Sequence, residues 1–219
     1  MRTKDIISDK IPTVCSECAA SNSLAIMTEH GINALPITDE DIYKGIIFKK
    51  DLCKITDKNA SIQPIIKDFP GISSEAHILE AVERLSQSNE PILPVISPEN
   101  HYIGTVTAQT VLSGITKLCN TAHTGSIIEM EMFPEDYSIT ELSRIVEDNR
   151  CKVINLFTFP NDMTGRLKVQ IRINSEDASA VLQSLERFNY RVTAIYRPEG
   201  KLDARTQQRL RELLYYLEM

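Results

Sequence analysis

The first half of the chain contains the same sequence pattern twice. Residues 11–17 read I-P-T-V-C-S-E, and residues 69–75 read F-P-G-I-S-S-E, 58 positions later. The same offset relates Leu35-Pro36-Ile37 to Leu93-Pro94-Val95. A repeat of this length is a unit that cannot bury its apolar face alone and therefore packs against its copy. The two copies predict a pseudo-symmetric module with a cleft between them, and we expect a ligand in that cleft.

The spacing of apolar residues predicts the same elements in each repeat. A short strand is followed by an amphipathic helix, two strands joined by a polar turn, and a second helix. The expected strands are Thr13–Cys15, Ala34–Thr38 and Ile42–Phe48 in the first repeat, and Gly71–Ser73, Ile92–Ile96 and Tyr102–Thr107 in the second. The second helices begin at Lys49 and Ala108. The sequence thus predicts a β-α-β-β-α unit twice, over about 3–60 and 61–120.

The pattern changes near residues 120–125, where small and polar residues cluster, so we expect a domain boundary there. Residues 125–198 alternate strand and helix patterns in the order β-α-β-β-α-β, which is the ferredoxin-like arrangement. Its second helix is expected to bury Val181, Leu182, Leu185 and Phe188. A last helix is predicted over 201–219, with Leu210, Leu213, Leu214 and Leu217 on one face. The fold class is therefore α/β in the mixed, α+β sense.

Charge and composition exclude several classes of protein. The chain has 24 Lys+Arg and 30 Asp+Glu, a net charge of −6, and no basic run of the kind that binds nucleic acid. Its apolar runs are too short for a membrane span, and residues 1–5 lack the apolar core of a signal peptide. Five cysteines predict no disulfide framework, so we expect a cytoplasmic protein with reduced thiols and no membrane partner.

A single C-x-x-C motif, Cys15-Ser16-Glu17-Cys18, could suggest metal or redox chemistry. A zinc site needs four ligands, and the sequence offers no second pair near this one. The second repeat has Ser73-Ser74-Glu75-Ala76 at the same place, which favours an incidental spacing and predicts no metal site. The sequence also contains no recognisable Ser–His–Asp or Cys–His arrangement and no glycine-rich phosphate loop. We therefore expect no enzymatic activity.

These patterns resemble known families. Residues from about 3 to 118 resemble a tandem pair of CBS motifs, through Asp5-Ile6-Ile7, the Leu-Pro strands, and the G-h-h-x-x-x-D segment from Gly45 to Asp51. Residues from about 126 to 196 resemble an ACT domain. Together they resemble the small acetoin-utilisation-like CBS–ACT proteins. The resemblance implies a regulatory ligand such as AMP, ADP, ATP or S-adenosylmethionine, and no required cofactor.

The resemblance also implies which residues bind that ligand. In a nucleotide-binding CBS motif, a Ser or Thr three residues after the glycine meets phosphate, and an Asp three residues further holds the ribose hydroxyls. The first repeat has Phe48 and Asp51 at these positions, and the second has Thr107 and Thr110. The candidate half-sites are therefore Thr13, Pro36 and Asp51 in the first repeat, and Gly71, Pro94, Thr107 and Thr110 in the second.

Each half-site keeps only one of its two polar anchors. We expect the first to hold an adenosine with little phosphate contact and the second to bind more weakly or to take a different ligand. Alternative roles remain for two residues: Asp51 could stabilise the start of a helix through the helix dipole, and Thr107 could be a helix cap.

The ACT-like segment lacks a glycine in residues 132–138, where backbone would approach an amino acid, so dimerisation is favoured over amino-acid binding. We interpret the chain as a non-catalytic, homodimeric regulator that binds an adenosyl ligand and signals to an unidentified protein partner. The apolar stripe of the terminal helix favours the dimer, although that helix could instead fold back on its own chain. The alternatives are a ligand-free dimerisation scaffold and an amino-acid sensor.

Overall fold

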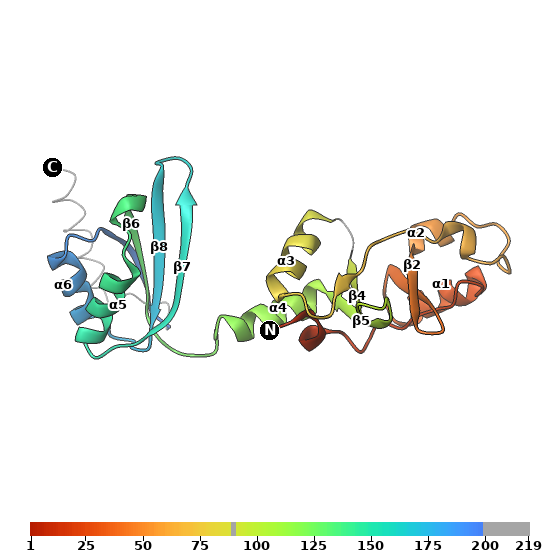
Figure 1. Cartoon of the computed structure of the whole chain (residues 1–219), viewed down its shortest axis with the longest axis horizontal. Helices are drawn as coiled ribbons and strands as arrows, with labels where there is room; N and C mark the ends of the chain where they lie inside the picture. Colours follow the sequence, from red (N-terminus) through yellow and green to blue (C-terminus); the bar gives the residue numbers. More distant parts are fainter. Residues whose placement is uncertain (89–90, 199–219) are drawn as a thin grey trace. The chain divides into compact units, whose positions relative to one another are not determined.

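The computed structural model describes residues 1–88 and 91–198, which fall into two compact units (Figure 1). One unit runs from Met1 to Leu118 and the other begins at Cys119. The helix predicted over 201–219, with its leucine stripe, lies outside the described residues. In the part of the chain that is described, no helix is long and apolar enough to cross a bilayer.

The first repeat is built around a two-stranded antiparallel sheet. Its elements are α1 (Ala20–Glu29), β1 (Ala34–Asp39), β2 (Ile42–Phe48) and α2 (Lys49–Leu52). The strand expected at Thr13–Cys15 is reduced to one parallel bridge between Val14 and Ile37. Helix α2 is a single turn, because the polar, turn-forming segment that follows Ile55 does not continue the apolar helical pattern.

The second repeat has the same order of elements. A short helix η2 (Gln63–Ile65) precedes β3 (Ile72–Ser73), α3 (Ile78–Gln87), β4 (Ile92–Ile96), β5 (Tyr102–Thr107) and α4 (Ala108–Leu118). Strand β4 pairs with β3 in parallel and with β5 antiparallel. The N-terminal helix η1 (Thr3–Ile6) belongs to this repeat in space, since Ile6 is buried in its core with Ile72 and Ile78. The predicted β-α-β-β-α repeat is confirmed.

The two repeats pack against each other through a shared apolar cluster. Ala34, Tyr43, Ile46 and Phe48 of the first repeat meet Ile92 of the second. The backbone also crosses between them: the Tyr43 N–H donates to the Asn100 carbonyl at 3.0 Å, and the Tyr102 N–H donates to the Asp41 carbonyl at 2.8 Å. Each repeat therefore covers apolar surface that the other leaves exposed, as the repeat pattern predicts.

The second unit is one antiparallel sheet with two helices packed on it. Its elements are β6 (Ile127–Met132), η3 (Pro134–Asp136), α5 (Ile139–Asp148), β7 (Val153–Asn161), β8 (Arg166–Ile173), α6 (Ser179–Arg187) and β9 (Val192–Tyr196). The strand order β7-β8-β6-β9 is the predicted ferredoxin-like one. Residues of β6, β8, α5 and α6 form a single core, so both helices cover the same face of the sheet.

Two sequence expectations are wrong in detail. Phe188, expected in the buried stripe of α6, is 44% exposed, because the helix ends at Arg187 and Phe188 is its C-cap. Its ring instead lies 5.6 Å from the Arg144 guanidinium. Cys15 and Cys18, expected as reduced thiols, form a disulfide across a tight turn that brings their Cα atoms within 5.3 Å.

Candidate functional site

A pocket of about 470 Å³ lies beside α2 in the first repeat. Its walls come from the α2 region and from the segment that links the two repeats. The lining residues are Asp51, Lys54, Ile55, Pro64, Ile65, Ile66 and Lys67. Of the residues predicted for the first half-site, Asp51 lines this pocket. Thr13 lies next to Val14, whose N–H donates to the Pro36 carbonyl at 3.3 Å, so Thr13 and Pro36 are neighbours.

Gly45 brings the linker segment to this site. Ile46 and Lys67 exchange backbone hydrogen bonds of 3.1 and 2.8 Å, so the linker forms one antiparallel bridge with β2. A Cβ atom on residue 45 would lie 2.4 Å from the Lys67 carbonyl oxygen, and the φ angle of Gly45 is +142°. Both facts require a glycine here. The glycine of the G-h-h-x-x-x-D segment therefore positions Lys67 next to Asp51.

Two lysines pair with the Asp51 carboxylate. Lys54 Nζ lies 2.9 Å from Oδ1, and Lys67 Nζ lies 2.9 Å from Oδ2. These ammonium groups, Lys54 first, hold the pKa of Asp51 at about 2, well below its usual value. The Asp51 side chain is only 15% exposed, whereas those of Lys54 and Lys67 are 74% and 50% exposed. The carboxylate is thus ionised at neutral pH and fixed in place, while both lysines can turn towards a ligand.

The Phe48 ring is buried and does not line the pocket, but two lysines lie over it. Lys50 and Lys67 place their Nζ atoms 4.9 and 5.1 Å from the centre of the Phe48 ring. Chemically, the arrangement offers a carboxylate acceptor for hydroxyl groups and ammonium groups for an anion, separated by a few ångströms. The sequence predicts Asp51 as a ligand residue, and this stays a prediction; it does not point to Lys54 and Lys67, which line the same pocket. The contribution of Lys67 depends on pairing between the linker and β2, which no local spacing reveals.

The second half-site is organised differently. The Thr107 N–H donates to Thr110 Oγ1 at 3.0 Å, and the Thr110 N–H donates to Thr107 Oγ1 at 3.2 Å. The two hydroxyls therefore cap the start of α4 reciprocally. The Gly71 carbonyl accepts from Arg84 Nη1 at 3.0 Å, and Pro94 is buried in β4. Thr107 therefore acts as a helix cap, which is one of the two roles expected for it. A ligand-binding role for these residues stays a prediction.

A second pocket, of about 420 Å³, lies in the second unit. It contains Glu131, whose carboxylate accepts from Asn161 Nδ2 at 2.8 Å and from Thr164 Oγ1 at 3.1 Å. These hydrogen bonds, that from Asn161 first, lower the pKa of Glu131. The Arg166 guanidinium lies 4.6 Å from the Phe133 ring in the same pocket. The pocket is thus lined by the opposite charges of Glu131 and Arg166. It lies at residues 132–138, where the resemblance to ACT domains implies a ligand-binding loop.

The described residues contain no group of three or more His, Cys, Asp and Glu side chains that could hold a metal ion. His77 caps α3, with Nδ1 accepting from the Leu79 N–H at 3.4 Å, and His30 is the C-cap of α1. These two histidines therefore have local roles at helix ends.

Comparison with protein families agrees with the repeated fold. The family model described as the CBS domain matches residues 4–57 and 61–117, which together are half of the chain. The chain belongs to the CBS domain family. Its curated relatives include the inosine-5'-monophosphate dehydrogenase of Methanocaldococcus jannaschii, which is 26% identical over 113 residues. That CBS region is 51% of this chain but only 23% of the dehydrogenase, so the chain spans about a quarter of the relative's length.

Solved structures are similar to about half of the chain. A CBS domain pair/ACT domain protein from Thermotoga maritima is 22% identical, with a TM-score of 0.50 over 54% of this chain and 98% of that protein. The CBS-pair protein CBSX2 of Arabidopsis thaliana, in a structure with AMP, is 17% identical, with a TM-score of 0.48 over 53% of this chain and 97% of that one. At 22% identity, the similarity to the Thermotoga maritima protein shows a shared fold alone.

Proposed function

We propose that this CBS protein is a non-catalytic sensor that binds an adenosyl ligand in the pocket beside Asp51. The observation that carries the proposal is the pairing of one fixed carboxylate with two exposed lysines in a pocket of about 470 Å³. A carboxylate can accept hydrogen bonds from both hydroxyls of a ribose. The lysines would meet a negatively charged group on the same ligand.

The lysines also change which adenosyl ligand we expect. The loss of a Ser or Thr at Phe48 favours adenosine over its phosphates, but Lys54 and Lys67 supply charge that the motif lacks. We therefore favour AMP, ADP or ATP over neutral adenosine. A ligand of this kind regulates only if it binds one arrangement of the protein better than another. Lys67 lies over Phe48, which belongs to the cluster between the repeats, so a ligand that moves Lys67 would bias their packing. An unidentified protein partner would bind one of these arrangements in preference to the other.

A thermal-shift panel tests this proposal. It would compare adenosine, AMP, ADP, ATP, S-adenosylmethionine and common amino acids, each added to the full chain. A ligand present at 100 times its Kd should stabilise the folded protein by about 2.7 kcal/mol. We expect the adenine nucleotides to raise the unfolding temperature most. If no adenosyl compound shifts the transition, the sensor proposal is wrong and a ligand-free scaffold is favoured. A shift with an amino acid alone would instead favour sensing through the Glu131 and Arg166 pocket.

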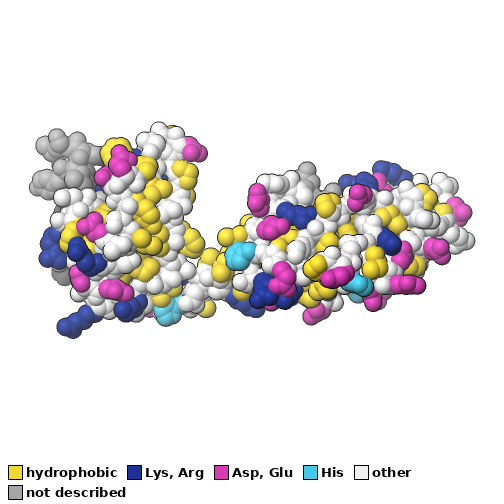
Figure 2. All heavy atoms as spheres, viewed as in Figure 1, with side chains coloured by type: hydrophobic (Ala, Val, Ile, Leu, Met, Phe, Trp, Pro, Cys, Tyr) yellow, Lys and Arg dark blue, Asp and Glu magenta, His cyan; other side chains and the backbone are white. Residues whose placement is uncertain are grey.

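We further propose that the protein acts as a homodimer through its ACT-like unit. Strand β7 is an edge strand, and its Phe157 and Phe159 are 45% and 39% exposed. Figure 2 shows hydrophobic side chains gathered over the strands of this unit. An exposed apolar edge strand favours pairing with a second copy. Light scattering at micromolar concentration should give a multiple of 24.7 kDa. A species near that single-chain mass would show that the chain is monomeric.

A further inference from the structure

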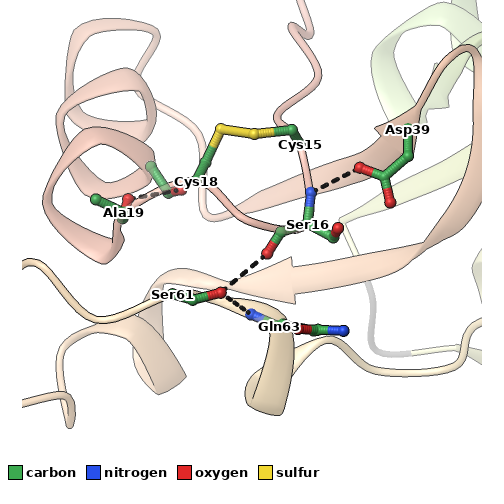
Figure 3. The surroundings of a disulfide bond; sticks show 8 residues. Cys15, Ser16, Cys18, Ala19, Asp39, Ser61 and Gln63 are labelled. Carbon is green, nitrogen blue, oxygen red and sulfur yellow. Dashed lines mark hydrogen bonds between the residues drawn. A yellow bond between two sulfur atoms is a disulfide. The ribbon is translucent and has the colours of Figure 1, made fainter.

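We propose that Cys15 and Cys18 form a reversible thiol–disulfide centre, a site of exchange with dithiols in solution. The two residues are joined by a disulfide, with their Cα atoms 5.3 Å apart (Figure 3). They lie in the turn between the Val14 bridge and α1, outside the pocket beside Asp51. The proposal concerns a chemistry separate from adenosyl binding and does not depend on it.

The second repeat shows that this turn does not need a covalent bond. In the first repeat the Cys18 N–H donates to the Cys15 carbonyl at 3.2 Å. In the second, the Ala76 N–H donates to the Ser73 carbonyl at 3.0 Å, and no cysteine is present. Each turn follows a parallel pairing, Val14 with Ile37 and Ile72 with Val95. A disulfide that closes so short a loop also constrains the unfolded chain least. A purely structural role therefore explains this disulfide poorly.

The surroundings of the turn hold it without using the sulfur atoms. The Ser16 N–H donates to Asp39 Oδ1 at 2.9 Å, and the Ser61 hydroxyl donates to the Ser16 carbonyl at 3.3 Å (Figure 3). The Ile62 N–H donates to the Cys18 carbonyl at 3.1 Å. These bonds can persist when the disulfide is open. They would keep the two thiols close, so that the intramolecular disulfide can form again.

The two cysteines differ in exposure, which assigns their roles. Cys15 is exposed and Cys18 is half-buried, so an incoming thiolate reaches the Cys15 sulfur more easily. Cys18 is then the leaving group. It lies immediately before the N-cap of α1, and the first turn of that helix contains no acidic residue. The positive end of the helix dipole favours a thiolate there. Glu17 precedes Cys18 in the chain, and its negative charge would repel a thiolate. Its side chain is exposed, so solvent screens this repulsion.

The exchange balances as a two-electron reaction. A thiolate of an external dithiol attacks Cys15 Sγ, the Cys15–Cys18 bond breaks, and Cys18 leaves as a thiolate. The second thiolate of the reagent then attacks the reagent's first sulfur atom, which is bonded to Cys15 in the mixed disulfide, and Cys15 is released as a thiolate. The protein disulfide is reduced to two thiols, which take up the two protons lost by the dithiol, and the dithiol is oxidised to its disulfide. The reverse sequence restores the bond.

The test uses the full chain, equilibrated in buffers with different ratios of reduced to oxidised dithiothreitol and then trapped by an alkylating reagent. Peptide mass spectrometry reads each cysteine. We expect Cys15 and Cys18 to become alkylated together, in one transition with a two-electron dependence on the ratio. Cys53, which is exposed and unpaired, should be alkylated at every ratio and serves as the internal control. The variant Cys53→Ser should leave the transition unchanged.

Three outcomes would overturn the proposal. Alkylation of Cys15 and Cys18 even at the most oxidising ratio would mean that no disulfide forms. A bond that resists reduction until the protein is unfolded would instead be structural. The double variant Cys15→Ser/Cys18→Ala copies the Ser73-Ser74-Glu75-Ala76 turn of the second repeat. It should keep the wild-type circular dichroism and unfolding temperature to within a few degrees. Loss of folding in this variant would also show that the disulfide is structural.

Discussion

Replacing Asp51 by alanine should weaken binding of an adenine nucleotide by tenfold or more. The carboxylate is ionised, only 15% exposed and fixed by two lysines, so it is prepared to accept hydrogen bonds from ribose hydroxyls. A lost hydrogen bond to a charged group typically costs one to two orders of magnitude in affinity. Calorimetric titration of the full chain measures this change directly.

The size of the loss should depend on the ligand. Without Asp51, Lys54 and Lys67 lose their anionic partner and become more available to phosphate groups. The affinity for adenosine should therefore fall more than the affinity for ATP. Asp51→Asn keeps the shape of the side chain but removes its charge, and we expect an intermediate loss.

Asp57→Ala is the matched control. Asp57 is an exposed aspartate of the same repeat, and its carboxylate accepts only a local hydrogen bond, from the Asn59 N–H at 3.0 Å, within the described residues. This substitution should leave the affinity unchanged. Equal affinities in wild type and Asp51→Ala would contradict the ribose role and leave Asp51 as an element of helix α2.

Replacing Gly45 by alanine should strongly destabilise the N-terminal unit. The new Cβ would lie 2.4 Å from the Lys67 carbonyl oxygen and 2.9 Å from the Ile66 side chain, at a φ of +142°. The linker must move, and the backbone of residue 45 is strained as well. We expect a loss of about 2–4 kcal/mol in the free energy of unfolding. Urea unfolding, monitored by circular dichroism, measures it.

Gly31→Ala separates these two causes. Gly31 also has a positive φ, +65°, but among the described residues nothing lies within 4 Å of the place that an alanine methyl group would take. Only the backbone strain remains, so we expect a loss of about 1–2 kcal/mol. If Gly45→Ala is no more destabilising than Gly31→Ala, the close approach of the linker to β2 is wrong. In that case the position of Lys67 beside Asp51 is wrong too.

The sequence alone was sufficient for the order of elements. Strands β4 (Ile92–Ile96) and β5 (Tyr102–Thr107) begin and end where the apolar pattern predicts. That pattern depends only on residues close together in the sequence. It occurs in both repeats, so each copy supports the interpretation of the other. The second unit has no repeat, but its ferredoxin-like order was also predicted from local pattern, namely strict alternation in β8 and the apolar stripes of α5 and α6.

The chemistry of the sites required the tertiary structure. Asp51 was predicted from its motif, but Lys67 joins it only because the linker pairs with β2 across Gly45. The Cys15–Cys18 spacing is visible in the sequence, yet its geometry depends on a turn held by Asp39 and Ser61, far along the chain. Periodicity reports which face of an element is buried. It does not report which distant segment lies against that element, and these contacts decide the charge and reactivity of a site.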